Sequence, residues 1–466
     1  MVILLEEVLR DSQTPGLIDT TWGDSGKGRY ADDIAYILIN KLRRETVAYR
    51  PNGGPNTGHT IWVDGRKIVF HSISSAATVQ GIECLSGRAM AVNPKQFIGE
   101  VDNLKELGYK PKVGIDYGAH LIMPWHIILD NLTGKKVGTT GRGVGPCMET
   151  KMSRKGYVTV EMLTQPETLR LQIEEALEVL GPKLKDLTDK YVFEGGDLQK
   201  LLLKIEAITS EDFPDMFVDG RVNSNYISAV MKNHLTYGEK IKDSIIDVEE
   251  IVRDRVKQGK VILIEGVQGN NLDVTFGSYP YVTAGNTTRF GLEHDAGIGI
   301  DLCINVSKAY GTRVGEGPFP TELYGDEAVE LRKAGDEFGA TTGRPRRPGL
   351  LDGPANKRNI YLNSRRGERK FLALTKLDVL IGRTPSICAS YNLDGVNIEY
   401  YDARNLGRAK PGEIMRFGSI EDVRGCTRIS EVPPNAMDYL SAIERLAEAE
   451  IIAVGKGKNR GELIFR

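Results

Sequence analysis

The sequence has 466 residues, 40% of them hydrophobic and 27% charged, and a formal net charge of −2. This balance is ordinary for a globular chain, so it excludes wholesale disorder and gives no sign of a nucleic-acid or acidic-membrane binder. No apolar run reaches the roughly 18 residues that a membrane-spanning helix needs.

The first ten residues carry acidic side chains and lack both a basic region and a cleavage site, so we expect no signal peptide. The five cysteines are scattered and form no CxxC pair. We interpret them as reduced thiols. Together these features predict a cytoplasmic protein.

Short apolar runs that lead into glycine-rich turns recur along the chain. They occupy residues 16–20, 46–50 and 261–264, and residues 371–375 form a similar run. Such strand-then-turn units, mixed with helical stretches, are typical of a parallel sheet with helices on both faces. We therefore predict an α/β fold with a large, mainly parallel central sheet flanked by helices.

One long stretch of the chain has a different pattern. From about residue 165 to 258 it is rich in Leu, Glu and Lys with helical spacing, as at Leu169, Ile173 and Leu177, and Gly181-Pro182 punctuates it. We interpret it as a mainly helical insertion. The chain is therefore predicted to be a single domain, residues 1–466, that carries this insertion.

The first glycine-rich turn, residues 21–28, reads TWGDSGKG. Closely spaced glycines let backbone N–H groups approach phosphate oxygens, and Lys27 adds a positive charge. The order resembles a P-loop but is not GxxxxGK[ST], and a tight turn with a solvated lysine is the alternative. Asp24 would be repelled by phosphates unless it holds Mg²⁺ or acts as a base, which points to a catalytic role.

The second glycine-rich turn, residues 53–60, reads GGPNTGHT. A histidine among such glycines is a candidate general acid, and we assign this role to His59. A merely solvated side chain is the alternative.

Taken in order along the chain, these segments resemble the adenylosuccinate synthetase family. The family's WGDEGKG and GGHNAGHT correspond to the two turns, with Ser25 in place of Glu, and Pro55 and Thr57 in place of His and Ala. The further matches to family motifs are GTTGRGVGP at 138–146, EGVQG at 265–269, YPYVTAGNTT at 279–288, RVGEGPFPTEL at 313–323, EFGATTGR at 337–344 and LTKLDVL at 374–380.

The resemblance implies a P-loop-NTPase-like fold and a ligase that forms a C–N bond. Such an enzyme joins L-aspartate to C6 of IMP through a 6-phosphoryl intermediate, with GTP as phosphate donor and Mg²⁺ as cofactor. Asp24 would take the N1 proton, His59 would act as an acid, and Gln268 would face the O6 and N1 edge of the purine. Asp24 and the carbonyl of Gly58 would also hold Mg²⁺.

The same resemblance implies three groups of binding residues and a homodimer with shared active sites. For Asp378 there is also a chemical argument that does not depend on the resemblance, because a carboxylate can accept hydrogen bonds from both N1–H and N2–H of guanine. The GTP residues would be Gly23, Ser25, Gly26, Lys27, Gly28, Lys376 and Asp378. The nucleotide-phosphate residues would be Asn56, Thr140, Thr283 and, from the partner subunit, Arg154; the L-aspartate residues would be Thr341, Thr342, Arg344 and Arg346.

Two alternatives remain open at this point. A related phage branch uses dGMP in place of IMP and replaces the loop aspartate by a small residue. Retention of Asp24 favours IMP, whereas the small Ser25 could relax the pocket and keeps dGMP under consideration. The chain could also be a guanine-nucleotide-binding regulator without ligase activity, which the presence of all the catalytic candidates argues against.

Overall fold

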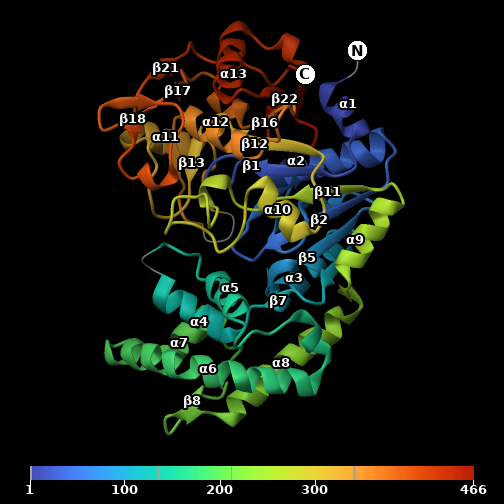
Figure 1. Ribbon diagram of the computed structural model, residues 1–466, viewed down its shortest axis with the longest axis vertical. Coiled ribbons are helices and arrows are strands. Elements are labelled where there is room, and N and C mark those ends of the chain that lie inside the picture. Colours follow the sequence, from blue (N-terminus) through green and yellow to red (C-terminus); the bar gives the residue numbers. More distant parts are fainter. Residues whose placement is uncertain (1–2, 135–136, 211–212, 340–342) are drawn as a thin grey trace.

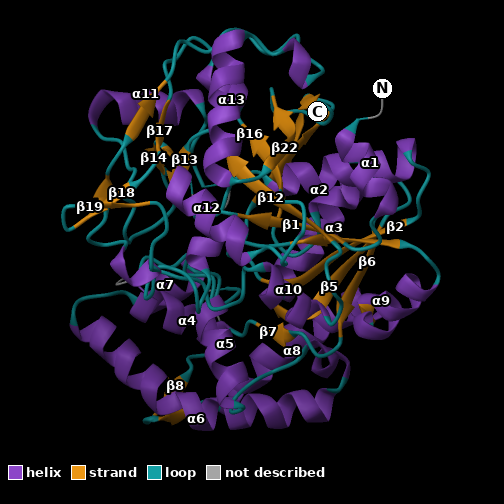
Figure 2. Ribbon diagram, turned by 45° about the horizontal axis from the view of Figure 1, so that its top comes forward, coloured by secondary structure: helices purple, strands orange, loops and turns teal. Residues whose placement is uncertain are grey.

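The computed structural model describes residues 3–134, 137–210, 213–339 and 343–466. At its centre lies a twisted sheet of eleven strands among these residues (Figures 1 and 2). All its pairings are parallel except the last, so the predicted fold class is confirmed. The order is β10 (Ile245–Ile246), β6 (Lys112–Asp116), β5 (Glu83–Val92), β2 (Thr46–Gly53), β11 (Val261–Glu265), β1 (Pro15–Asp19), β12 (Leu302–Lys308), β16 (Phe371–Thr375), β22 (Glu450–Gly455) and β23 (Leu463–Phe465), with β7 (His120–Leu121) beside β5.

The central strands are buried on both faces, which is why they read as unbroken apolar runs. In β1, Leu17 packs in one core cluster with Tyr30, whereas the next residue, Ile18, packs in another with Leu292. Successive side chains of the strand therefore point to opposite faces of the sheet, and each face packs against its own layer of helices. The described helices are α1 (Leu4–Asp11), α2 (Lys27–Tyr36), α3 (Pro94–Glu106), α4 (Pro124–Thr133), α5 (Val144–Ser153), α6 (Pro166–Phe193), α7 (Leu198–Lys204), α8 (Ser224–Ile241), α9 (Val248–Lys257), α10 (Arg289–Ala296), α11 (Gly325–Ala334), α12 (Gly353–Leu362) and α13 (Pro434–Ala447).

The stretch predicted as a helical insertion contains α6 to α9. In Figure 1, α6 and α8 lie at the end of the molecule opposite α13. The expected interruption at Gly181-Pro182 is wrong, because α6 is one helix of 28 residues with Pro182 in its interior. The missing N–H of one proline removes only one hydrogen bond from this long helix. After α8 the chain returns to the main sheet, where β10 pairs with β6.

The remaining short strands form hairpins and small sheets outside the central sheet. No helix of the described ranges is long and apolar enough to cross a membrane. The small strands are β3 (His59–Val63), β4 (Arg66–Phe70), β8 (Phe217–Val218), β9 (Arg221–Val222), β13 (Gly311–Arg313), β14 (Arg347–Gly349), β15 (Leu351–Asp352), β17 (Ser386–Cys388), β18 (Tyr391–Leu393), β19 (Val396–Ile398), β20 (Lys410–Pro411) and β21 (Ile414–Arg416).

Parallel packing brings the turns after β1, β2, β11 and β16 to one edge of the sheet. Ligands of open α/β sheets bind outside this carboxyl edge. The two glycine-rich turns, the EGVQG segment and the TKLD segment all begin there. The candidate site is therefore assembled from segments that are far apart in sequence.

Candidate active site

The turn between β1 and α2 is organised by a buried carboxylate. Asp19 accepts hydrogen bonds from the backbone N–H of Ser25 at 3.1 Å and from Nζ of Lys27 at 3.2 Å. Gly26, with φ of +96°, ends the turn and precedes the first residue of α2. A helix N-terminus beside a lysine is suited to phosphate oxygens. The hydroxyl of Ser25 contacts that of Thr21 at 3.2 Å, and Ser25 is buried.

Asp24 follows Gly23 in this turn and adopts a left-handed conformation, with φ of +58°. Its carboxylate accepts a hydrogen bond from Nε of Arg346 at 2.7 Å, and Arg346 also donates to buried Glu337 at 2.9 Å. Burial alone would raise the pKa of Asp24, but the charges of Arg346 and Lys308 hold it below its ordinary value. The carboxylate is therefore ionised at neutral pH.

His59 begins β3, and its Nδ1 lies 2.5 Å from Oε1 of Glu265. Glu265 ends β11 and is fully buried, where it also accepts from both Ser74 and Ser75. Burial would raise the pKa of Glu265, but His59, the charge of Arg50 and the Ser75 hydroxyl hold it below its usual range. Burial lowers the pKa of His59, and the ionised Glu265 opposes this shift. A proton on Nδ1 of His59 is thus held in the hydrogen bond to Glu265. The other ring nitrogen, Nε2, is the one left to contact a ligand.

Close packing brings the two turns together. A Cβ added at Gly28 would lie 2.6 Å from the Ser75 hydroxyl and 2.8 Å from Cβ of His59. Only a glycine lets α2 approach β3 this closely.

Two cavities meet at these turns. One has a volume of about 330 Å³ and the other about 540 Å³. They share four lining residues that belong to the turns, namely Asp24, Lys27, Gly58 and His59. This arrangement can place two ligands end to end, with a carboxylate, a cation and an imidazole at their junction.

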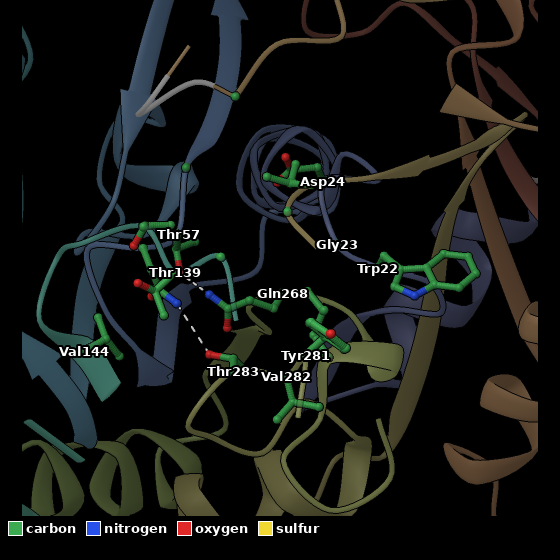
Figure 3. Close-up of a pocket in the computed structure, with 18 of the residues that line it drawn as sticks. Trp22, Gly23, Asp24, Thr57, Thr139, Val144, Gln268, Tyr281, Val282 and Thr283 are labelled. Atoms are coloured by element: carbon green, nitrogen blue, oxygen red, sulfur yellow. Dashed lines mark hydrogen bonds between the residues drawn. The ribbon is translucent and has the colours of Figure 1, made fainter. Parts of the chain in front are cut away.

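The first cavity contains the residues expected to bind the acceptor nucleotide. Gln268 donates from Nε2 to Thr57 at 2.9 Å, and Asn56 donates to Thr283 at 3.4 Å. Figure 3 shows Gln268, Thr57 and Thr283 around this cavity. Gly23, Thr140 and Arg344 also line it.

The second cavity contains most of the residues expected to bind the donor nucleotide, among them Gly26, Gly28, Lys376 and Asp378. Arg346, which was expected to bind L-aspartate, lines this second cavity. Oδ1 of Asp378 is buried and has no hydrogen-bond partner in the described parts of the chain. Burial raises the pKa of Asp378. Such an unpaired acceptor is suited to a ligand that brings donors.

One expected site residue lies outside both cavities, and two are not among the described residues. Arg154 caps the end of α5, is exposed and lines neither cavity of its own chain. Thr341 and Thr342 lie outside the described residues.

Sequence reasoning missed the carboxylates that support the site. Glu265 and Glu337 each lie in a matched segment, and neither was given a role. Glu337 is fully buried and accepts from Lys308 at 2.8 Å and from Tyr310 at 2.6 Å. The sequence does carry one signal for Glu265, which is its place at the end of an unbroken apolar strand. A carboxylate there is expected to be buried, and a buried carboxylate requires partners.

Comparisons with known proteins agree on one family. The family model described as adenylosuccinate synthetase matches residues 17–464. Curated adenylosuccinate synthetases of Myxococcus xanthus and Azotobacter vinelandii are each 36% identical over 463 and 461 residues, which cover 96% of this chain and 97% of each relative. A structure of fully ligated adenylosuccinate synthetase from Plasmodium falciparum has a TM-score of 0.77 and 28% identity, covering 97% of this chain and 100% of that one.

A more distant structure shares the fold alone. The cyanophage S-2L succinoaminodeoxyadenylate synthetase, bound to dGMP and to dATP as an energy donor, has a TM-score of 0.56 and 16% identity. The match covers 97% of this chain and 95% of the phage protein.

Proposed function

The chain belongs to the adenylosuccinate synthetase family, and we propose how its two joined cavities catalyse the GTP-dependent ligation of L-aspartate to C6 of IMP. It is a ligase that forms a C–N bond, in purine nucleotide biosynthesis. The observation that carries the mechanism is the junction at Asp24, Lys27, Gly58 and His59, where an acceptor in one cavity meets a donor in the other.

In the first step, ionised Asp24 takes the N1 proton of IMP, and O6 attacks the γ-phosphorus of GTP. The bond from that phosphorus to the bridging oxygen breaks, and GDP leaves. Phosphoryl transfer mainly requires positioning and neutralisation of charge, which Lys27 and the N-terminus of α2 supply. His59 stabilises the transferring group from Nε2, and Gln268 orients the O6 edge.

In the second step, the amine of L-aspartate attacks C6 of the 6-phosphoryl intermediate. The C6–O6 bond breaks, phosphate leaves with O6, and one amine proton is released to give adenylosuccinate. Arginine forks suit carboxylates, so Arg344 and Arg346 would receive those of L-aspartate, with Thr341 and Thr342.

The donor set at the junction fits Mg²⁺. The Asp24 carboxylate and the Gly58 carbonyl are hard oxygen donors, and both line the two cavities. In the described ranges, no three His, Cys, Asp or Glu side chains form a metal cluster, which suits a cation that keeps water and phosphate oxygens as ligands. Bound there, Mg²⁺ would neutralise charge on the donor phosphates.

GTP is the expected donor. The buried, unpaired Oδ1 of Asp378 suits the N1–H and N2–H of guanine, and adenine has no such pair. The stem of Lys376 would cover the base. Gly23 and Ser25 would contribute through the backbone of the turn.

The acceptor is proposed to be IMP. The phage enzyme solved with dGMP supports only a common fold at 16% identity. The related phage branch that uses dGMP replaces the loop aspartate by a small residue, so the retention of Asp24 at the junction favours IMP.

The active unit is proposed to be a homodimer in which Arg154 completes the partner's phosphate site with Asn56, Thr140 and Thr283. Its exposure, outside the cavities of its own chain, supports this assignment. We place the reaction in the cytoplasm, because all five cysteines are free and buried.

A product assay tests the proposed function. The purified protein is incubated with Mg²⁺, GTP, L-aspartate and either IMP or dGMP, and the nucleotides are identified by mass spectrometry. Adenylosuccinate formation from IMP is expected, and Asp24→Asn should reduce it by about 10² to 10⁴. Succinylated product from dGMP alone would show that the acceptor is wrong.

A further inference from the structure

The loop between β13 and α11 presents one carboxylate, that of Glu316, to the acceptor cavity. Buried Arg313 donates to the backbone carbonyl of Glu316 at 3.0 and 2.7 Å, and to that of Pro318 at 2.9 Å. Arg347 donates to the carbonyls of Gly315 at 3.2 Å and Gly317 at 2.9 Å. Two guanidinium groups therefore fix the backbone on both sides of Glu316, while its side chain is 62% exposed.

The side chain of Glu316 lies on the cavity wall. A Cβ added at Gly138 would be 3.0 Å from Cγ of Glu316, so the stem packs against Gly138. The carboxylate lies 3.9 Å from Nη2 of Arg344, and Nη1 of Arg344 donates to the Gly138 carbonyl at 3.3 Å. All three residues line the acceptor cavity. At 3.9 Å the ion pair is too long for a hydrogen bond, so the carboxylate oxygens keep accepting capacity.

Chemistry narrows what this carboxylate can bind. An ionised carboxylate only accepts hydrogen bonds, and a phosphate would repel it. In the proposed function, Asp24 and Gln268 face the N1 and O6 edge of the purine, and the L-aspartate amine must reach C6 beside them. The donors left on the acceptor nucleotide are the hydroxyl groups of its sugar.

We propose that Glu316 is a specificity-determining residue that accepts a hydrogen bond from the 2′-hydroxyl of the acceptor's ribose, so that the enzyme prefers ribonucleotides to 2′-deoxyribonucleotides. This inference rests on the proposed function, because it takes the orientation of the purine from it. A hydrogen bond to a charged acceptor discriminates by about 10- to 100-fold against a ligand that lacks the donor.

The test measures binding and turnover for the two sugars with each base. Dissociation constants of IMP, dIMP, GMP and dGMP are measured by calorimetry, and kcat/KM by product formation for IMP and dIMP. The wild type should prefer each ribonucleotide by about 10- to 100-fold. In Glu316→Ala the ratio of ribonucleotide to deoxyribonucleotide affinity should fall towards one. The reason is weaker binding of the ribonucleotides, while binding of the deoxyribonucleotides stays unchanged. Glu316→Gln, which keeps a neutral acceptor, should lie between them.

Glu327→Ala is the matched control, since Glu327 is exposed on α11 outside both cavities. The inference is overturned if the sugar preference is the same in wild type and Glu316→Ala. It is also overturned if the loss follows the base and not the sugar, or if only KM for L-aspartate changes. A wild type that binds the nucleotides but makes no product would contradict the proposed function alone, because the binding data still decide the role of Glu316.

Discussion

Nε of Arg346 donates a hydrogen bond to the Asp24 carboxylate across 2.7 Å. Under our proposal, Asp24 is the base for N1 and Arg346 receives a carboxylate of L-aspartate. One arginine therefore links the two roles, because a substrate carboxylate that draws Arg346 away also removes a positive charge from Asp24. The pKa of Asp24 would rise at that moment, which makes it a better base.

Replacement of Arg346 by Gln tests this link. The variant should raise KM for L-aspartate by about 10- to 100-fold, since a charge-assisted contact is lost. Asp24 must be ionised to act, so activity falls as pH drops through its pKa. That pKa lies below the ordinary value in the free wild-type enzyme and should rise without Arg346, which moves the acid limb of the kcat/KM profile to higher pH.

Arg346→Lys keeps the charge and should leave the acid limb nearer its wild-type position. Arg366→Gln is the control, because Arg366 is exposed and lines neither cavity. An unchanged acid limb together with an unchanged KM for L-aspartate in Arg346→Gln would refute the coupling.

Glu265→Gln should impair His59. Because the Nδ1 proton is committed to Glu265, Nε2 can donate only when the ring is an imidazolium. Loss of the carboxylate leaves burial to lower the pKa of His59 unopposed. The protonated form then disappears at lower pH, so the basic limb of the kcat profile should move to lower pH, with a loss of about 10- to 100-fold at neutral pH.

Ser75→Ala is matched to that variant, since it removes a 2.6 Å donor from the same carboxylate and keeps the ion pair with His59. Its basic limb should stay close to that of the wild type. Equal pH profiles for Glu265→Gln and the wild type would show that His59 does not act as an acid.

Asp378→Asn should erode the choice of donor nucleotide. The neutral amide can no longer accept from both guanine donors, so kcat/KM for GTP should fall by about 10-fold or more, while that for ATP changes little. Steady-state kinetics with both nucleotides measure this ratio. Asp336→Asn alters another aspartate on the same cavity and should keep the preference. Equal kcat/KM values for ATP and GTP in the wild type would contradict the guanine assignment.

Subunit mixing tests Arg154 in trans. Arg154→Ala and Asp24→Ala should each be nearly inactive alone at limiting nucleotide. In a mixed dimer, one site combines an intact Asp24 with an intact Arg154. Half the dimers are mixed and each has one good site, so about one quarter of wild-type activity should return. No recovery despite confirmed subunit exchange would place Arg154 outside the partner's site.

Local sequence patterns predicted the central strands of the sheet. The apolar runs at 16–20, 46–50, 261–264 and 371–375 correspond to β1, β2, β11 and β16. These strands are buried on both faces, so their pattern is simple, and the turns that follow them meet because the strands are parallel.

The contacts within the site could not be predicted in the same way. His59 and Glu265 are 206 residues apart, and Asp24 and Arg346 are 322 apart. No local periodicity encodes such pairs, because they depend on how the loops pack at the sheet edge. Ser25 shows a different limit, since the sequence does not say which way a side chain points within a turn, and the hydroxyl of Ser25 faces Thr21.

The central claim is that O6 of IMP attacks the γ-phosphorus of GTP before L-aspartate attacks C6. The most direct measurement uses IMP labelled with ¹⁸O at O6, with Mg²⁺, GTP and L-aspartate, and analyses the released phosphate by mass spectrometry. We predict that each phosphate carries the one ¹⁸O atom from C6, together with one adenylosuccinate and one GDP. Adenylosuccinate formed with unlabelled phosphate would contradict the account, because the O6 atom would then leave C6 without passing to phosphorus.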